Sequence, residues 1–238
     1  MVHIQSDNKG LTLVELMVAM AISLLVLGLV VASLISQQKN QITQDRMIDM
    51  QQGVRAALEI MGTDLKMAGY NPTGTAGATF LIADRAEIEF QLDLNADGDL
   101  TNSGPPVTSD PGELIRYALT NDANRDGVAD GAACHLGREV DGSGLQVLAE
   151  NIEALNFVYF DRNGAVLATP VANVNEINSV QVTIIAKSGT TIPALFQRHR
   201  DNRTYSNRQG TEILPDRNDD FRRIVLVHEF KCRNLQLN

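Results

Sequence analysis

The sequence predicts an α+β protein in which one long N-terminal α-helix packs on a C-terminal domain of antiparallel β-strands. Three patterns support this prediction. Residues 11–35 form an apolar run whose single charged side chain is Glu15. A helical spacing of apolar residues then continues to residue 69, and an alternating spacing typical of strands begins near residue 78. The first half of this helix is long enough to cross a membrane.

Composition narrows the class of function. The chain has 238 residues, a formal net charge of −9 and 5% aromatic residues. No second apolar run approaches the roughly 18–20 residues of a membrane helix, which excludes a polytopic membrane protein. An acidic pI of about 4.9 argues against nucleic acid as a partner. The sequence has no nucleophile–base motif, phosphate-binding loop or glycine-rich cofactor turn, so neither catalysis nor a small-molecule substrate is expected.

The N-terminal segment predicts a signal anchor. Ten residues ending in Lys9 and Gly10 precede the apolar run, and Lys9 favours a cytoplasmic start. Residues 11–35 span about 38 Å as a helix, more than the ~30 Å hydrocarbon core. Glu15 inside this run costs about 2.5–3.5 kcal/mol at mid-bilayer, so it requires a partner. Residues 11–38 contain no Lys, Arg or His, which leaves the α-amino group that cleavage between Gly10 and Leu11 would create.

Residues 9–19 resemble the class III signal of type IV pilins and type II secretion pseudopilins. Gly10, Thr12 and Glu15 match that signal, whereas Leu11 stands where phenylalanine is usual. The resemblance implies that a prepilin peptidase cleaves after Gly10 and methylates Leu11. It also implies that Glu15 neutralises the N-terminus of an adjacent subunit during filament assembly. The alternative is a plain membrane anchor with Glu15 near the headgroups.

The helix is expected to change character after residue 36. Its second half, residues 37–69, is amphipathic and should rest on the C-terminal domain. Gly69 is the expected C-cap, and Pro72 follows it. We therefore predict one helix over residues 11–69, about 88 Å long. The stretches 55–58 and 67–72, together with the chain end at 231–235, resemble PilW-like minor pilins. The predicted organisation is a leader over 1–10, a membrane or filament-core helix over 11–36, the amphipathic half over 37–69, and a β-rich domain over 70–238.

Alternating apolar residues predict the strands of the globular domain. They should form one antiparallel sheet, with one face against the amphipathic half-helix and the other largely solvated. An Asn-Gly pair at Asn163 and Gly164 predicts a hairpin turn. The predicted strands lie at residues 88–92, 115–119, 154–160, 165–168, 179–187 and 223–232.

Two acidic loops within residues 93–131 predict calcium binding. This segment has eight acidic side chains and two arginines, and so carries −6 of the net charge. Alternate oxygen-bearing side chains with a glycine at the sixth position suit Ca²⁺. The EF-hand pattern needs a glutamate at the twelfth position, where this chain has Gly104, so Asp110 or Glu113 would replace it. The alternative is solvated Asx turns. The expected ligands are Asp93, Asn95, Asp97 and Asp99 in the first loop and Asp122, Asn124, Asp126 and Asp130, with the Val128 carbonyl, in the second.

Two further features bear on the exported domain. An oxidising compartment favours a disulfide between Cys134 and Cys232, which would tie the last strand to the acidic segment. Residues 198–223 are rich in arginine and are expected to be a solvated loop; the alternative is a DNA-contacting patch.

Together these features predict a minor pilin, PilW-like, that helps to initiate, prime or cap a type IV pilus. Its partners would be other major and minor pilins, the prepilin peptidase and the inner membrane before assembly. It would cross the inner membrane once, with a periplasmic C-terminal domain, and then reach the cell surface. The alternatives are a J-type minor pseudopilin of a type II secretion system and a membrane-anchored, calcium-dependent adhesin.

Overall fold

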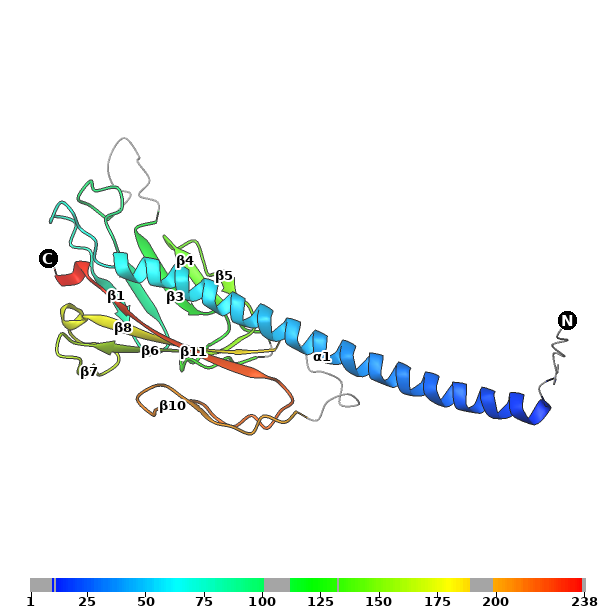
Figure 1. Ribbon diagram of the computed structural model, residues 1–238. Helices are drawn as coiled ribbons and strands as arrows, with labels where there is room; N and C mark the ends of the chain where they lie inside the picture. The colour runs from blue at the N-terminus through cyan, green and yellow to red at the C-terminus, as the bar shows by residue number, and fades with distance from the viewer. Residues whose placement is uncertain (1–9, 11, 101–111, 132, 189–198, 237–238) are drawn as a thin grey trace, which may run out of the picture. The chain divides into compact units, whose positions relative to one another are not determined.

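The computed structural model describes residues 10, 12–100, 112–131, 133–188 and 199–236. These residues fall into two compact units, which divide between Asp45 and Arg46. One α-helix, α1 (Leu13–Met67), contributes to both units (Figure 1). Its 55 residues confirm the predicted long helix, which begins and ends two residues inside the expected bounds.

The C-terminal end of α1 is capped by residues distant in sequence. Gly69 has a φ of 75°, a left-handed conformation that glycine adopts without strain. A Cβ on Gly69 would lie 2.5 Å from Leu235, which belongs to the short 3₁₀-helix η2 (Asn234–Gln236). The Asn234 side chain donates to the Lys66 carbonyl at 2.9 Å. The end of the chain therefore closes the end of the helix.

In the part of the chain that the structure describes, the β-strands form three antiparallel sheets (Figure 1). The five-stranded sheet has the order β1-β2-β3-β4-β5, and comprises β1 (Phe80–Ala83), β2 (Ile88–Gln91), β3 (Leu114–Leu119), β4 (Leu136–Val140) and β5 (Gln146–Ala149). The four-stranded sheet has the order β11-β8-β6-β7, and comprises β6 (Ile152–Phe160), β7 (Val166–Leu167), β8 (Ser179–Lys187) and β11 (Arg223–Lys231). The two-stranded sheet pairs β9 (Tyr205–Ser206) with β10 (Glu212–Leu214).

One hydrophobic core joins the C-terminal half of α1 to both larger sheets. The helix contributes a stripe at three- and four-residue spacing, Val54, Leu58, Met61 and Leu65, as the sequence predicts. The core continues through the five-stranded sheet with Phe80, Ile88, Phe90, Ile115, Tyr117 and Leu136. It extends through the four-stranded sheet with Leu155, Phe157, Tyr159, Val180, Val182 and Ile184.

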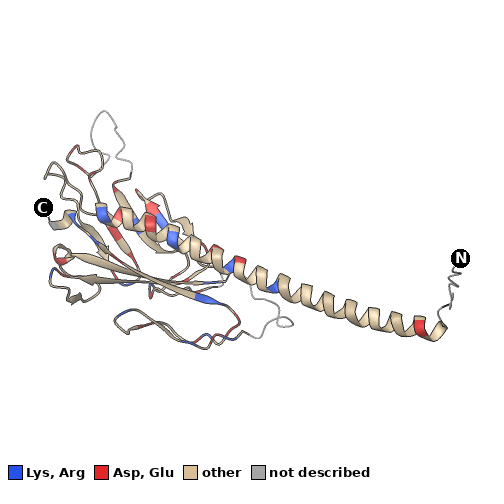
Figure 2. Ribbon diagram, in the orientation of Figure 1, with Lys and Arg blue, Asp and Glu red and all other residues tan. Residues whose placement is uncertain are grey.

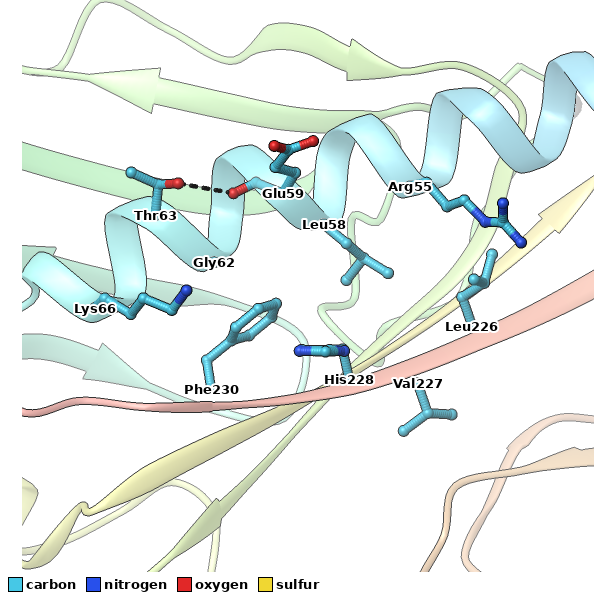
Figure 3. A pocket seen from close by; sticks show the side chains of 10 residues that line it. All are labelled: Arg55, Leu58, Glu59, Gly62, Thr63, Lys66, Leu226, Val227, His228 and Phe230. Atoms are coloured by element: carbon cyan, nitrogen blue, oxygen red, sulfur yellow. Dashed lines mark hydrogen bonds between the residues drawn. The ribbon is translucent and has the colours of Figure 1, made fainter.

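Strand β11 approaches α1 closely at one point (Figure 3). A Cβ on Gly62 would lie 2.3 Å from the Phe230 ring, so the absence of a side chain on Gly62 allows this contact. Beside it, a cavity of about 440 Å³ opens between the helix and β11. Its lining mixes apolar and charged side chains, including Leu58, Arg55 and His228.

All six predicted strands are present, but the expectation of a single sheet is wrong. Strands β1, β4 and β5 were not expected, and with β2 and β3 they make a separate sheet. Strand β4 includes Gly137 and Arg138, so its residues do not show the alternation that marks β3. Cross-strand pairing partners, which the local pattern does not encode, decide the division into sheets.

The second face of the four-stranded sheet is covered rather than solvated. Strands β6 and β8 are buried along almost their entire length on both faces. Tyr205 and Leu214, from β9 and β10, pack there against Ala154 and Ile185. Residues 199–223 of the arginine-rich segment therefore fold back over the sheet through these side chains, which corrects the expectation of a solvated loop.

A buried ionic network, which we call the Arg223 network, secures this covering segment. The side chain of Arg223 is 1% exposed and contacts three carboxylates. The shortest contacts are 2.5 Å to Glu153, 3.2 Å to Asp201 and 2.5 Å to Asp219. Asp201 also accepts from the Tyr205 hydroxyl at 2.5 Å. Arg223, Arg203 and Arg217 therefore contact the protein's own acidic groups.

Candidate functional site

The helix N-terminus forms a reciprocal capping arrangement between Thr12 and Glu15. The Glu15 backbone N–H donates to the Thr12 hydroxyl at 3.2 Å, and Glu15 Oε2 accepts from the Thr12 N–H and hydroxyl, each at 2.9 Å. This is a capping box, and the Thr-x-x-Glu spacing is its signal in the sequence. Glu15 thus stabilises its own helix. Gly10 is exposed, and Leu11 lies outside the described residues.

The first unit exposes apolar side chains on all sides of the helix. Sixteen large hydrophobic residues between Leu13 and Ile35 are 43–74% exposed. No charged residue follows Glu15 until Lys39, and Figure 2 shows this uncharged stretch. The helix is long and apolar enough to cross a membrane, a property that a signal sequence shares. A helix apolar all round is not a surface helix of a soluble domain, because such helices have a polar face.

A comparison with known families identifies this segment. Residues 5–31 match the family described as "Prokaryotic N-terminal methylation motif". The chain carries a prokaryotic N-terminal methylation motif. The match includes the predicted processing residues Gly10 and Leu11 and the predicted assembly residue Glu15. The motif covers the start of the apolar helix that is long enough to cross a membrane.

The other comparisons add little to this match. No curated protein matches the chain. Among solved structures, the chain is similar to a type IV-like pilin from Thermus thermophilus, with 13% identity and a TM-score of 0.44. The similarity covers 77% of this chain and 97% of that one.

The first acidic loop, residues 93–99, is held by hydrogen bonds between its own side chains and backbone. Asp93 Oδ2 accepts from the Gly98 N–H at 3.2 Å, and Asn95 Oδ1 accepts from the Asp97 N–H at 2.9 Å. Asp97 Oδ1 accepts from the Asp99 N–H at 3.0 Å. The predicted ligands of this loop therefore lie around one turn.

The second acidic loop, residues 122–130, has the same arrangement. Asp122 Oδ2 accepts from the Gly127 N–H at 2.8 Å, and Asn124 Oδ1 accepts from the Asp126 N–H at 3.2 Å. Asp126 Oδ1 accepts from the Val128 N–H at 2.8 Å. Asp130, the last predicted ligand, instead accepts from the Ala123 N–H at 2.7 Å. Burial raises the pKa of Asp122, although these backbone hydrogen bonds lower it in part.

The side chains in these loops do not form a preorganised cluster of three carboxylate ligands. Among the residues that the structure describes, no three His, Cys, Asp or Glu side chains converge as metal ligands. Of the two candidates for the missing ligand, Asp110 lies outside the described residues, and Glu113 lies beneath the first loop. Glu113 Oε1 accepts from the backbone N–H groups of Leu94 and Asn95 at 2.9 and 3.3 Å. Calcium binding stays a prediction.

The predicted disulfide between Cys134 and Cys232 is wrong. Both thiols are free and buried. The Cys134 carbonyl accepts from the N–H of Ile152, at the start of β6. The N–H of Cys232 donates to the Asn178 carbonyl, and the N–H of Asn178 donates to the Phe160 carbonyl, at the other end of β6. Eight residues of β-strand separate these ends by about 26 Å, far beyond the ~7 Å limit between bridged Cα atoms. Sequence alone does not show which end of a strand each cysteine approaches.

A polar contact that the sequence patterns do not predict joins α1 to the five-stranded sheet. Asp64 on the helix accepts from the Tyr117 hydroxyl at 2.5 Å and from Arg138 at 2.7 Å. Burial, followed by the hydrogen bond to Asp64, raises the pKa of Tyr117 well above its usual range. Asp64 and Tyr117 are 53 positions apart, and Tyr117 and Arg138 are 21 apart, so no local sequence pattern predicts this contact.

Proposed function

We propose that this chain is a minor type IV pilin, PilW-like, that helps to initiate, prime or cap pilus assembly as a structural subunit rather than an enzyme. The observation that carries the proposal is the N-terminal methylation motif at the start of a helix that is apolar on every side. Cleavage by a prepilin peptidase after Gly10 would expose the new N-terminus directly before the Thr12–Glu15 cap.

The energetics of the exposed helix support assembly. Burying a fully exposed large apolar side chain contributes about 1.5–3 kcal/mol. The sixteen side chains are 43–74% exposed, so covering the remaining surface contributes on the order of 12–24 kcal/mol in total. A bilayer covers a helix on all sides, and so does a bundle of similar helices from other pilins. The same surface therefore serves first in the inner membrane and then in the filament core, while the C-terminal domain is periplasmic and later faces the surroundings.

Glu15 would have a second role in the filament, besides capping its own helix. Its two contacts with Thr12 both use Oε2. The second carboxylate oxygen can accept from the methylated ammonium of a neighbouring subunit. An ammonium and a carboxylate that meet in an apolar filament core attract strongly because the surroundings screen their charges little. This contact would set the axial register between subunits.

Mass spectrometry of the protein purified from membranes tests the processing step. The expected product is a chain that begins at methylated Leu11. A mature protein that still begins at Met1 would refute the proposal.

A matched pair of variants then tests the assembly step. Glu15→Gln keeps an oxygen that can accept from Thr12 but removes the charge, whereas Glu15→Ala removes both. Both variants should be cleaved, and both should be incorporated less into filaments. Normal incorporation of Glu15→Gln would show that helix capping, rather than the charge, is the function of this residue.

Deletion of the gene separates a pilus subunit from a J-type pseudopilin, which would have the same sequence features. Loss of surface filaments with normal protein secretion supports the pilin. Loss of secretion with normal filaments would favour the pseudopilin instead.

A further inference from the structure

The two acidic loops have the same backbone conformation. Their fourth residues, Ala96 and Arg125, both adopt left-handed conformations with φ of 62° and 56°, and the glycines at the sixth position have φ of 89° and 84°. In both loops the backbone N–H groups at the fifth, sixth and seventh positions donate to the side chains at the third, first and fifth positions. A difference in function between the loops must therefore come from the first aspartate and its surroundings.

The first aspartate distinguishes the two loops. Both carboxylate oxygens of Asp122 accept backbone N–H groups, Oδ1 from Asp126 at 3.1 Å and Oδ2 from Gly127 at 2.8 Å. Asp93 is 0% exposed, and its Oδ2 accepts from Gly98 and from Thr73. Its Oδ1 is buried and has no hydrogen-bond partner among the described residues.

A fully buried carboxylate oxygen without a donor is unfavourable, because nothing replaces the water that it loses on folding. A cation removes this penalty. Asp93 faces the loop, since its other oxygen binds Gly98 there. The oxygens of Asn95 and Asp97 lie in the same turn, and an oxygen that accepts one N–H keeps a lone pair for a metal ion.

We propose that the loop at residues 93–99 binds one Ca²⁺ ion through Asp93, Asn95 and Asp97, and that the loop at 122–130 binds none. Backbone carbonyls and water would complete the shell. This set has only two carboxylates, which is consistent with the lack of a three-carboxylate cluster. All available ligands are oxygens, and Ca²⁺ accepts six to eight of them in irregular geometry, whereas Mg²⁺ requires a strict octahedron.

Glu113 acts as a positioning residue for this site. Its Oε1 holds the N–H groups of Leu94 and Asn95, directly before the turn. The loop is also tied to the end of α1, because the Asp93 N–H donates to the Tyr70 carbonyl at 2.7 Å and the Thr75 hydroxyl donates to the Gly98 carbonyl at 3.2 Å. Bound calcium would thus stabilise the junction between the helix and the five-stranded sheet.

Calcium titration of the full-length protein in detergent tests the proposal, with CaCl₂ as the only added ligand. Calorimetry should give one ion per chain. At a concentration about 100 times the dissociation constant, the melting temperature should rise by about 5–10 °C relative to EGTA, and MgCl₂ should have a smaller effect. A stoichiometry of zero or two would overturn the proposal.

Matched substitutions locate the ion. Asp97→Asn and Asp126→Asn change the fifth position of each loop, and both retain an oxygen for the backbone. Asp97→Asn should lose at least tenfold in calcium affinity, whereas Asp126→Asn should bind as the wild type does. The opposite pattern would overturn the assignment. Because both variants retain the N-terminal motif, the result is independent of the proposed role in pilus assembly.

Discussion

Substitution of Arg223 by leucine should destabilise the C-terminal domain strongly. The guanidinium is buried with Glu153 and Asp201, whose side chains are 6% and 0% exposed, and with the partly exposed Asp219. Removal of one partner from a buried ion pair typically costs about 3–5 kcal/mol, because the remaining charge stays out of water. At about 2–4 °C per kcal/mol for a domain of this size, the melting temperature should fall by about 6–20 °C.

Near-ultraviolet circular dichroism is a suitable assay for this unfolding. The chain has four tyrosines and no tryptophan, and Tyr117, Tyr159 and Tyr205 are all buried in the domain. Their signal reports tertiary structure without interference from the long helix. The full-length protein in detergent should be melted at pH 7.

Arg203 provides the matched control. It also contacts Asp201, at 3.2 Å, but its side chain is 62% exposed. Arg203→Leu should therefore cost at most about 1 kcal/mol. If Arg223→Leu melts within a degree or two of the Arg203 variant, the reasoning that burial makes this network important is refuted.

The pH dependence gives an independent test. Burial acts to raise the pKa of Asp201, but hydrogen bonds from Tyr205, Arg203 and Arg223 outweigh it and lower the pKa to about 2. A carboxyl with a depressed folded pKa contributes stability above its usual value of 3.8 and loses it as the pH falls toward 2. This contribution is about 2 kcal/mol. Since Arg223→Leu lacks one of the donors, the stability difference between the variant and the wild type should shrink between pH 4 and pH 2. A constant difference would contradict the coupling.

Three further outcomes are expected. Tyr117→Phe removes the hydroxyl that donates to Asp64 and should lower the free energy of unfolding by about 1–3 kcal/mol, measured by the same melting assay. Gly127→Ala should lower the melting temperature more than Gly142→Ala does. A Cβ at residue 127 would lie 2.4 Å from the Leu155 carbonyl oxygen, whereas nothing lies within 4 Å of a Cβ at the exposed residue 142. Equal melting temperatures for the two variants would argue against this close approach. Thiol titration after denaturation without reductant should find two free thiols per chain, and fewer would restore the disulfide hypothesis.

Local residue patterns account for much of this fold. The helix follows from an unbroken apolar spacing, and its end follows from Gly69, because these signals act within a few residues. Strands β2, β3, β6, β8 and β11 follow from alternation or from continuous apolar runs. The acidic loops follow from their spacing, and their shared turn is a local hydrogen-bonding preference of Asp and Asn.

The rest depends on contacts between distant residues. The division into sheets requires pairing partners, and the burial of both faces of β6 and β8 requires the β9–β10 hairpin to return over them. Arg223 pairs with Glu153, 70 residues away, so its role cannot be read from its neighbours in sequence. The difference between the two acidic loops also depends on tertiary packing, which buries Asp93 completely and leaves Asp122 partly exposed.

The long helix, the N-terminal methylation motif and the positions of the most regular strands follow from the amino-acid sequence, since each depends on residues close together in the chain. Three features depend on packing between distant residues. The two cysteines lie near opposite ends of β6, and buried charges hold the arginine-rich segment over the sheet. Of the two acidic loops, the first has a buried carboxylate oxygen without a hydrogen-bond partner among the described residues. Desolvation and ion pairing are properties of the packed surroundings, and a local pattern does not specify them.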